Sequence, residues 1–307
     1  MTPGAAQVAL EIVPRPGGMV VGASPALLGE PLVAVDLIIT VVAGLCLAAL
    51  VIRWAVRRLG DPLAAAPSRP NSLREDALAF AVAAYLAGLL AFAGGVKLAA
   101  GEADSLAGSL AVGSGAQLAG VAACLYLAAQ RFEGGIPAFF RSRAPAGAVG
   151  QFRPTVLTAL VAFAVCPFAL RMTEQTVRFF APDYTFPPHP TIERLQQGAL
   201  PAWAVAALWT SAVAIAPLAE EMFFRGIVQT LVLNVWRRRW LAIGLASLAF
   251  SAVHFPQPQA MPALAVLAVL LGYLYERTGS LVPPIVVHAL FNLKTLIWQS
   301  LGAAAPT

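Results

Sequence analysis

Long apolar segments, separated by short polar ones, follow one another along most of the chain. A transmembrane α-helix needs about 20 consecutive, mainly apolar residues. In lipid a helix also satisfies its own backbone N–H and C=O groups, which an open strand cannot do. The pattern therefore predicts an all-α, polytopic transmembrane helical bundle of about eight spans. The predicted spans are 32–52, 76–100, 106–130, 154–172, 200–236, 240–255, 260–276 and 281–299.

The segment at 200–236 is longer than one straight crossing requires. Its 37 residues would form a helix about 55 Å long, whereas the hydrocarbon core of a bilayer is about 30 Å thick. Pro217 lies in this segment and can kink or break a helix. We therefore expect a break, a strong tilt or a protrusion here, with the acidic residues after Pro217 facing a cavity. The prolines at 182–194 exclude a continuous helix and predict an exposed loop.

Composition agrees with a membrane protein and limits the role of the net charge. Hydrophobic residues make up 59% of the 307 residues and charged residues only 11%, against about 25% in an ordinary soluble domain. The formal charge of +5 comes from arginines concentrated in three loops, 57–74, 131–153 and 237–239, without stacking aromatic residues between them. This is the positive-inside pattern rather than a nucleic-acid groove. We expect these loops in the cytoplasm and both termini outside.

The stretch LAEEMFFRGIVQ at 218–229 places three charged residues in apolar sequence. Residues four apart lie on one face of a helix, so Glu221 and Arg225 can form an ion pair. Glu220 points about 100° away from Glu221, which leaves it available for chemistry. Ionisable residues inside a membrane are functional by default. The alternative is that all three form a buried structural cluster.

Two of the three histidines, His254 and His288, also lie in apolar spans. Phe250 precedes His254 by four residues and Asn292 follows His288 by four, so each pair shares one helix face. A lone intramembrane histidine is often an interhelical hydrogen bonder, and this is the alternative for each of them. Polar residues on three separate helices, with Glu220 on the first, favour one shared site.

The helix lengths allow these residues to meet. Counted from the turn at 237–239, Glu220 and His254 lie about 25 and 22 Å along their helices. A buried glutamate can take a proton from water while a histidine orients that water. His288 and Asn292 can donate hydrogen bonds to an oxyanion. Such a site could hydrolyse an amide bond.

Zinc is the alternative chemistry, with Glu220, His254 and His288 as ligands and an open position for water. The close H-E-x-x-H spacing of a helical zinc site is absent, so no cofactor is certain and zinc stays a candidate. No G-x-S-x-G motif indicates a serine nucleophile. The three cysteines lie in apolar segments without metal-ligand spacing and are predicted to be packing residues.

These motifs, in this order, resemble the CPBP intramembrane protease family, the CAAX protease and bacteriocin-processing group also called the Abi family. The family pattern is E-E-x-x-x-R, F-x-x-x-H and H-x-x-x-N on successive transmembrane helices. The resemblance covers about residues 200–299, and residues 1–199 match no motif. The matching residues are Glu220, Glu221 and Arg225, then Phe250 and His254, then His288 and Asn292.

The resemblance implies an endopeptidase that works in the lipid bilayer on a membrane-associated polypeptide substrate. It implies that Glu220 and His254 activate the attacking water and that His288 and Asn292 stabilise the oxyanion or complete the site. The remaining motif residues, Glu221, Arg225 and Phe250, would support these catalytic residues. The chain then divides into an N-terminal segment (1–31), N-terminal transmembrane helices with a loop (32–199), a catalytic transmembrane core (200–299) and a C-terminal tail (300–307).

Two lysines stand against 18 arginines, which is typical of a GC-rich bacterial genome. We therefore expect a multi-pass protein of the bacterial inner membrane, and no prenylated substrate. Two functions of other classes stay open: a non-catalytic immunity or scaffold protein of the same fold, and a proton-coupled carrier in which Glu220 and the histidines form a relay. The intact motifs speak against the first, and the lack of inverted repeats speaks against the second.

Overall fold

The computed structural model describes residues 10–15, 18–23, 60–100, 106–141, 147–187 and 200–300, together with parts of 34–52. Strands β1 (Leu10–Arg15) and β2 (Gly18–Ala23) pair antiparallel in a hairpin. The other described elements are helices. The predicted all-α helical bundle is confirmed, and the hairpin is an addition that the apolar pattern does not predict.

The helices follow the predicted apolar segments closely. Four described stretches, Glu75–Leu98, Ala107–Arg131, Gly150–Phe180 and Ala202–Trp236, are long and apolar enough to cross a bilayer. The protein is therefore a multi-pass membrane protein. The predicted first span at 32–52 is described only in part, with a short apolar helix over Leu37–Cys46. Five helices begin and end within a few residues of the prediction: α2 (Glu75–Ala100), α3 (Leu106–Arg131), α10 (Arg239–Ala252), α11 (Met261–Thr278) and α12 (Val282–Ser300).

Helix α5 (Gly147–Phe180) extends well beyond the span predicted at 154–172. Hydropathy marks the part of a helix that suits lipid, and not the residue at which helical hydrogen bonding stops. The 34-residue helix also contains two prolines, which transmembrane helices tolerate because neighbouring groups satisfy the freed backbone. The loop predicted at 182–194 is exposed at 182–185 and half-buried at 186–187, and its remainder lies outside the described residues.

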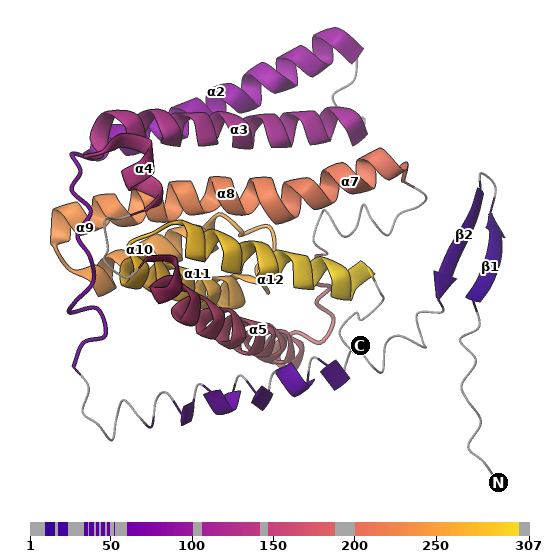
Figure 1. The fold of residues 1–307 in the computed structure, drawn as a ribbon. Coiled ribbons are helices and arrows are strands. Elements are labelled where there is room, and N and C mark those ends of the chain that lie inside the picture. The colour runs from indigo at the N-terminus through magenta and orange to yellow at the C-terminus, as the bar shows by residue number, and fades with distance from the viewer. Residues whose placement is uncertain are drawn as a thin grey trace.

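The helices are arranged in layers (Figure 1). The pair α2–α3 lies on one side of a long helical stretch labelled α7 to α9, and α10, α11 and α12 lie on its other side. Helix α5 packs on the outer face of α11 and α12. Each polar residue of the predicted site thus comes from the central helical stretch or from the layer directly beside it.

The central stretch stays helical from Ala202 to Trp236, which excludes a break at Pro217 and leaves a strong tilt or a protrusion as predictions. The stretch contains two π-helical segments, and the widened turn of the first, directly before Pro217, accommodates the missing proline N–H without ending the helix. The order is α7 (Ala202–Thr210), η1 (Ser211–Ile215), α8 (Ala216–Glu221), η2 (Met222–Gln229) and α9 (Thr230–Trp236).

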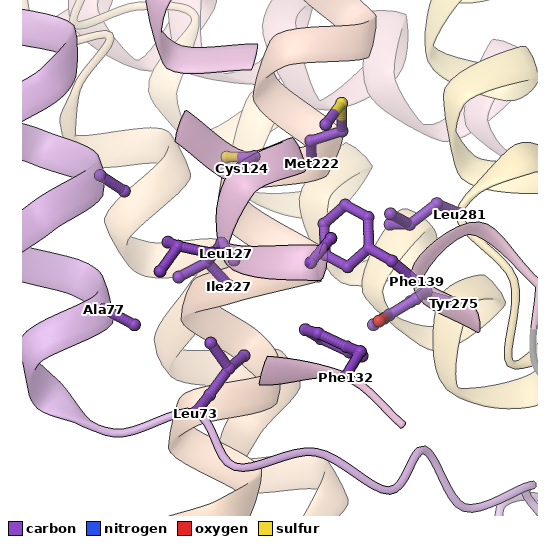
Figure 2. Close-up of a cluster of buried hydrophobic side chains, with 12 residues drawn as sticks. Leu73, Ala77, Cys124, Leu127, Phe132, Phe139, Met222, Ile227, Tyr275 and Leu281 are labelled. Carbon is purple, nitrogen blue, oxygen red and sulfur yellow. The ribbon is translucent and has the colours of Figure 1, made fainter. Parts of the chain in front are cut away.

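Figure 2 shows the apolar cluster that fixes η2 against the α2–α3 layer. The short helix α4 (Gly135–Phe140) inserts Phe139 between α3, η2 and α11, where the ring is fully buried. A Cβ atom at Gly226 would overlap the Phe139 ring. Gly226 therefore lets the aromatic ring pack directly on the helix one residue after Arg225.

The three arginine-rich loops meet at one end of the bundle. Ser72 donates its N–H to the carbonyl of Arg131 at 2.7 Å, and Arg239 donates to the carbonyl of Ala66 at 3.0 Å. Asn234 donates to Asn71 at 2.7 Å. The described parts of these loops therefore share one side, as the positive-inside pattern predicts.

Candidate active site

Glu221 and Arg225 form the buried ion pair that their spacing predicts. Arg225 Nη1 donates to Glu221 Oε1 at 2.9 Å, and both side chains are at most 1% exposed. Arg225 Nη2 also donates to the carbonyl of Ala268 at 3.2 Å, and its guanidinium lies 4.8 Å from the centre of the Phe250 ring. Several partners thus hold the buried charge in place, as a buried arginine requires.

His288 lies between the two adjacent glutamates. Its Nδ1 is 2.8 Å from Glu221 Oε1, and its Nε2 is 3.8 Å from Glu220 Oε2. A carboxylate can only accept, so Nδ1–H donates to Glu221 and Nε2 is the atom that faces Glu220. The two glutamates differ in exposure: the Glu220 side chain is 27% exposed and the Glu221 side chain is fully buried. Only Glu220 combines contact with this imidazole and access from outside.

Phe250 is the common neighbour of the two histidines. Its ring centre lies 4.9 Å from that of His254 and 5.8 Å from that of His288. His254 Nδ1 is 2.8 Å from the Phe250 carbonyl, which accepts a hydrogen bond from Nδ1–H and leaves Nε2 as the ring nitrogen available for chemistry. His254 was predicted inside the sixth span, but α10 ends at Ala252 and His254 lies in the turn that follows. The turn precedes Pro256, before which helical backbone is disfavoured.

Asn292 joins α12 to the first π-helical segment. Its Nδ2 donates to the Ala212 carbonyl at 2.9 Å. In η1 the N–H of Ala216 bonds to Ser211, one residue further back than in an α-helix, and Pro217 has no N–H to offer. The carbonyl of Ala212 is therefore left without its regular helical partner, and the Asn292 amide satisfies it. An amide group has two N–H donors, so one donor of Asn292 is not accounted for by this bond.

The imidazole and carboxylate groups of the site provide only part of the ligand set that a zinc ion needs. A histidine whose Nδ1–H bonds to a carboxylate or a carbonyl is arranged as a zinc ligand usually is. The 3.8 Å between Glu220 Oε2 and His288 Nε2 suits two ligands of one ion, each at about 2.0–2.2 Å. Among the described residues, however, no group of three His, Cys, Asp or Glu side chains is close enough to hold a metal ion. The described donors therefore do not form a complete zinc site.

A second buried polar cluster, which the motifs do not predict, surrounds Glu276. Arg69 Nη2 donates to Glu276 Oε1 at 2.5 Å, and Arg239 donates to Oε2. Gln229 Nε2 donates to Oε1 at 2.9 Å and to the Gly272 carbonyl at 3.1 Å. The signal in the sequence was an acidic residue within an apolar span, the same signal that pointed to Glu220.

Comparison with known proteins agrees with the motif order. Residues 201–294 match the family model described as type II CAAX prenyl endopeptidase Rce1-like. No curated protein and no solved structure matches the chain. The matched residues include the central helical stretch, both histidines and Asn292, so they contain the whole predicted site. The similarity of residues 201–294 to this family model agrees with the resemblance to the CPBP, or CAAX protease, family that the three motifs carry.

Proposed function

We propose that this protein hydrolyses peptide bonds of membrane-associated proteins or peptides, with Glu220 as the base that activates water. The different environments of the two adjacent glutamates support this assignment most directly. Glu221 is fully buried and accepts bonds from Arg225 and His288, whereas the Glu220 side chain is 27% exposed and faces His288 Nε2. A general base must reach both water and substrate, and Glu220 meets this condition better than Glu221.

His254 shares the task of orienting the water. Its Nδ1–H bonds to the Phe250 carbonyl, so its neutral ring carries a lone pair on Nε2. His288 Nε2 lies 3.8 Å from Glu220 Oε2, so one water beside the two atoms can hydrogen-bond to both. In the attack, Glu220 takes a proton from water as the water oxygen bonds to the substrate carbonyl carbon, and the C=O electron pair moves onto the carbonyl oxygen. When this oxyanion re-forms the carbonyl, the C–N bond breaks and Glu220 passes the proton to the leaving amine nitrogen.

The developing oxyanion needs donors, and His288 and Asn292 supply them in this proposal. His288 donates from Nε2 when both ring nitrogens are protonated, with Glu221 accepting at Nδ1. Asn292 keeps one N–H on Ala212 and offers the other. No step is assigned to zinc, and we propose that catalysis needs no metal cofactor.

The experiment compares the membrane peptides of host cells that express the wild type, Glu220→Gln or Glu133→Gln. Glu133 is exposed in a loop at the arginine-rich end and is the matched control. We expect mass spectrometry to find cleavage products that disappear with Glu220→Gln and persist with Glu133→Gln. Purified, folded Glu220→Gln that cleaves a substrate at the wild-type rate would contradict the assignment. The absence of any cleavage by the wild type would favour a non-catalytic protein of the same fold.

We further propose that the protein resides in the bacterial inner membrane, where its substrates lie in or beside the bilayer. The high ratio of arginine to lysine supports a bacterial source. Fractionation of the native cells, with detection of the full chain in the inner-membrane fraction, tests this location.

A further inference from the structure

A cavity lies at the arginine-rich end of the bundle, at the other end of the central helical stretch from η1. Its volume is about 560 Å³, and it is bounded by residues 67–74, by the end of α9 and by the turn at 237–239. Four arginines line it, and no acidic side chain is among its lining residues in the described part of the chain. The arginines are Arg69, Arg74, Arg237 and Arg239.

The buried carboxylate of Glu276 forms ion pairs with two of these arginines. Arg69 and Arg239 donate to opposite oxygens of Glu276, which is fully buried. Two positive charges on one carboxylate leave a surplus of one positive charge. The Arg69 side chain is 3% exposed, and its Nε has no hydrogen-bond partner. A buried donor without a partner is costly, so the hydrogen bonds of this lining arginine are incompletely satisfied.

The other two arginines stand at the mouth of the cavity. Arg237 is exposed and makes no ion pair with any described residue. Its backbone φ is 56°, in the left-handed region that residues other than glycine rarely adopt. Among the described residues, Arg74 pairs with Glu75 alone, at 3.7 Å with both side chains more than 70% exposed, and such surface pairs contribute little. In the described part of the chain neither guanidinium is held by a strong ion pair, so both can bind an anion.

The position of the cavity points to the membrane surface. Trp236 at the end of α9 and Trp240 at the start of α10 are about half exposed beside it. Exposed tryptophans of membrane proteins mark the level of the lipid headgroups. The lining also includes Leu73 and Leu233, so apolar surface lies next to the positive charge. A ligand with a phosphate and an apolar tail fits this combination better than a free polar anion.

We propose that this cavity binds the phosphate of an anionic phospholipid headgroup. Guanidinium groups match phosphate oxygens in geometry and charge, and basic pockets beside transmembrane helices take such headgroups. The site is separate from Glu220 and does not depend on the proposed peptidase activity. The bound lipid would tie the 67–74 segment to the end of the central helical stretch.

The test measures lipid binding to the full-length protein purified in detergent, by native mass spectrometry and thermal unfolding. The probes are phosphatidylglycerol, phosphatidylcholine with the same acyl chains, and inorganic phosphate. The test variant is Arg74→Gln/Arg237→Gln. The control variant is Arg238→Gln/Arg277→Gln, which removes the same charge from two exposed residues that do not line the cavity.

We expect the wild type and the control to bind phosphatidylglycerol in preference to phosphatidylcholine. The test variant should bind phosphatidylglycerol roughly 30-fold more weakly, because each of the two surface arginines contributes roughly fivefold. An equal loss in both variants would mean a general surface charge effect and would overturn the site. Failure of the wild type to distinguish the two lipids would also overturn it. Inorganic phosphate that displaces the lipid and stabilises the protein equally would assign the cavity to free phosphate instead.

Discussion

Nδ1 of His288 lies 2.8 Å from Oε1 of Glu221, so the second glutamate of the adjacent pair orients this imidazole. The same oxygen accepts from Arg225 at 2.9 Å. One buried carboxylate therefore compensates a buried guanidinium and fixes the direction of the ring that faces Glu220. Neutralising Glu221 should therefore affect stability and activity differently from neutralising Glu220.

We expect Glu221→Gln to destabilise the protein. The substitution leaves Arg225, which is 1% exposed, without a carboxylate, and breaking a buried ion pair from one side costs about 3–5 kcal/mol. Thermal unfolding in detergent measures the loss. Glu220→Gln is the control, because the Glu220 side chain is 27% exposed and forms no hydrogen bond with Arg225; this variant should unfold near the wild-type temperature. Equal stability of the two variants would mean that Glu221 does not hold the cluster.

Replacing Asn292 by alanine tests the proposed oxyanion donor. The loss of such a donor lowers kcat by about 10²–10³, and the Ala212 carbonyl would also lose its partner. Thr295→Ala on the same helix removes only a local hydroxyl-to-carbonyl bond and serves as the control. Steady-state cleavage of a fluorogenic peptide measures kcat. A drop in unfolding temperature with unchanged kcat would mean that Asn292 only stabilises the contact between α12 and η1, and would exclude the oxyanion role.

The apolar pattern predicts the helices well because the bilayer imposes a minimum length on each crossing. The spacing of the motifs also predicts the contact between Glu221 and Arg225, since four residues along one helix return to the same face. Contacts between different helices could not be predicted in this way. His288 and Glu221 are 67 residues apart, and the apolar pattern holds no information on which helices become neighbours.

The behaviour of Pro217 shows a second limit of the sequence. A proline in a helix removes one N–H, which correctly identifies a local disturbance. Whether the chain responds with a break or with a widened turn depends on what satisfies the freed carbonyl. Here the amide of Asn292, on α12, bonds to Ala212, and the stretch remains helical. This partner could not be identified before the helices were placed.

Cysteine labelling tests the orientation of the bundle. In a background without the three native cysteines, Glu133→Cys lies at the arginine-rich end and Asp183→Cys lies in the loop after α5, at the opposite end of that helix. We expect a membrane-impermeant maleimide to label Asp183→Cys in intact cells, and Glu133→Cys only after the membrane is opened, because arginine-rich loops stay in the cytoplasm. The reverse labelling would overturn the predicted topology.

Glu276 should matter for stability at the arginine-rich end. It is fully buried and accepts from both Arg69 and Arg239. Glu276→Gln leaves two arginines without their carboxylate. We expect the free energy of unfolding to fall by about 3–5 kcal/mol, as when one partner of a buried ion pair is removed. The adjacent exposed Arg277→Gln is the control. Limited proteolysis should cut the loop at 60–74 faster in Glu276→Gln, and an unchanged rate would show that Glu276 does not anchor this loop.

The last prediction concerns zinc. Glu220 and His288 offer two donors at a suitable separation, but the described residues contain no group of three that could hold the ion. We therefore expect chelation to leave activity intact, and His254→Ala to abolish cleavage without changing metal content. His189→Ala, which replaces the third histidine, is the matched control. Metal analysis of protein purified without added metal decides the question. Stoichiometric zinc that disappears in His254→Ala, with reversible inactivation by a chelator, would establish the zinc mechanism instead.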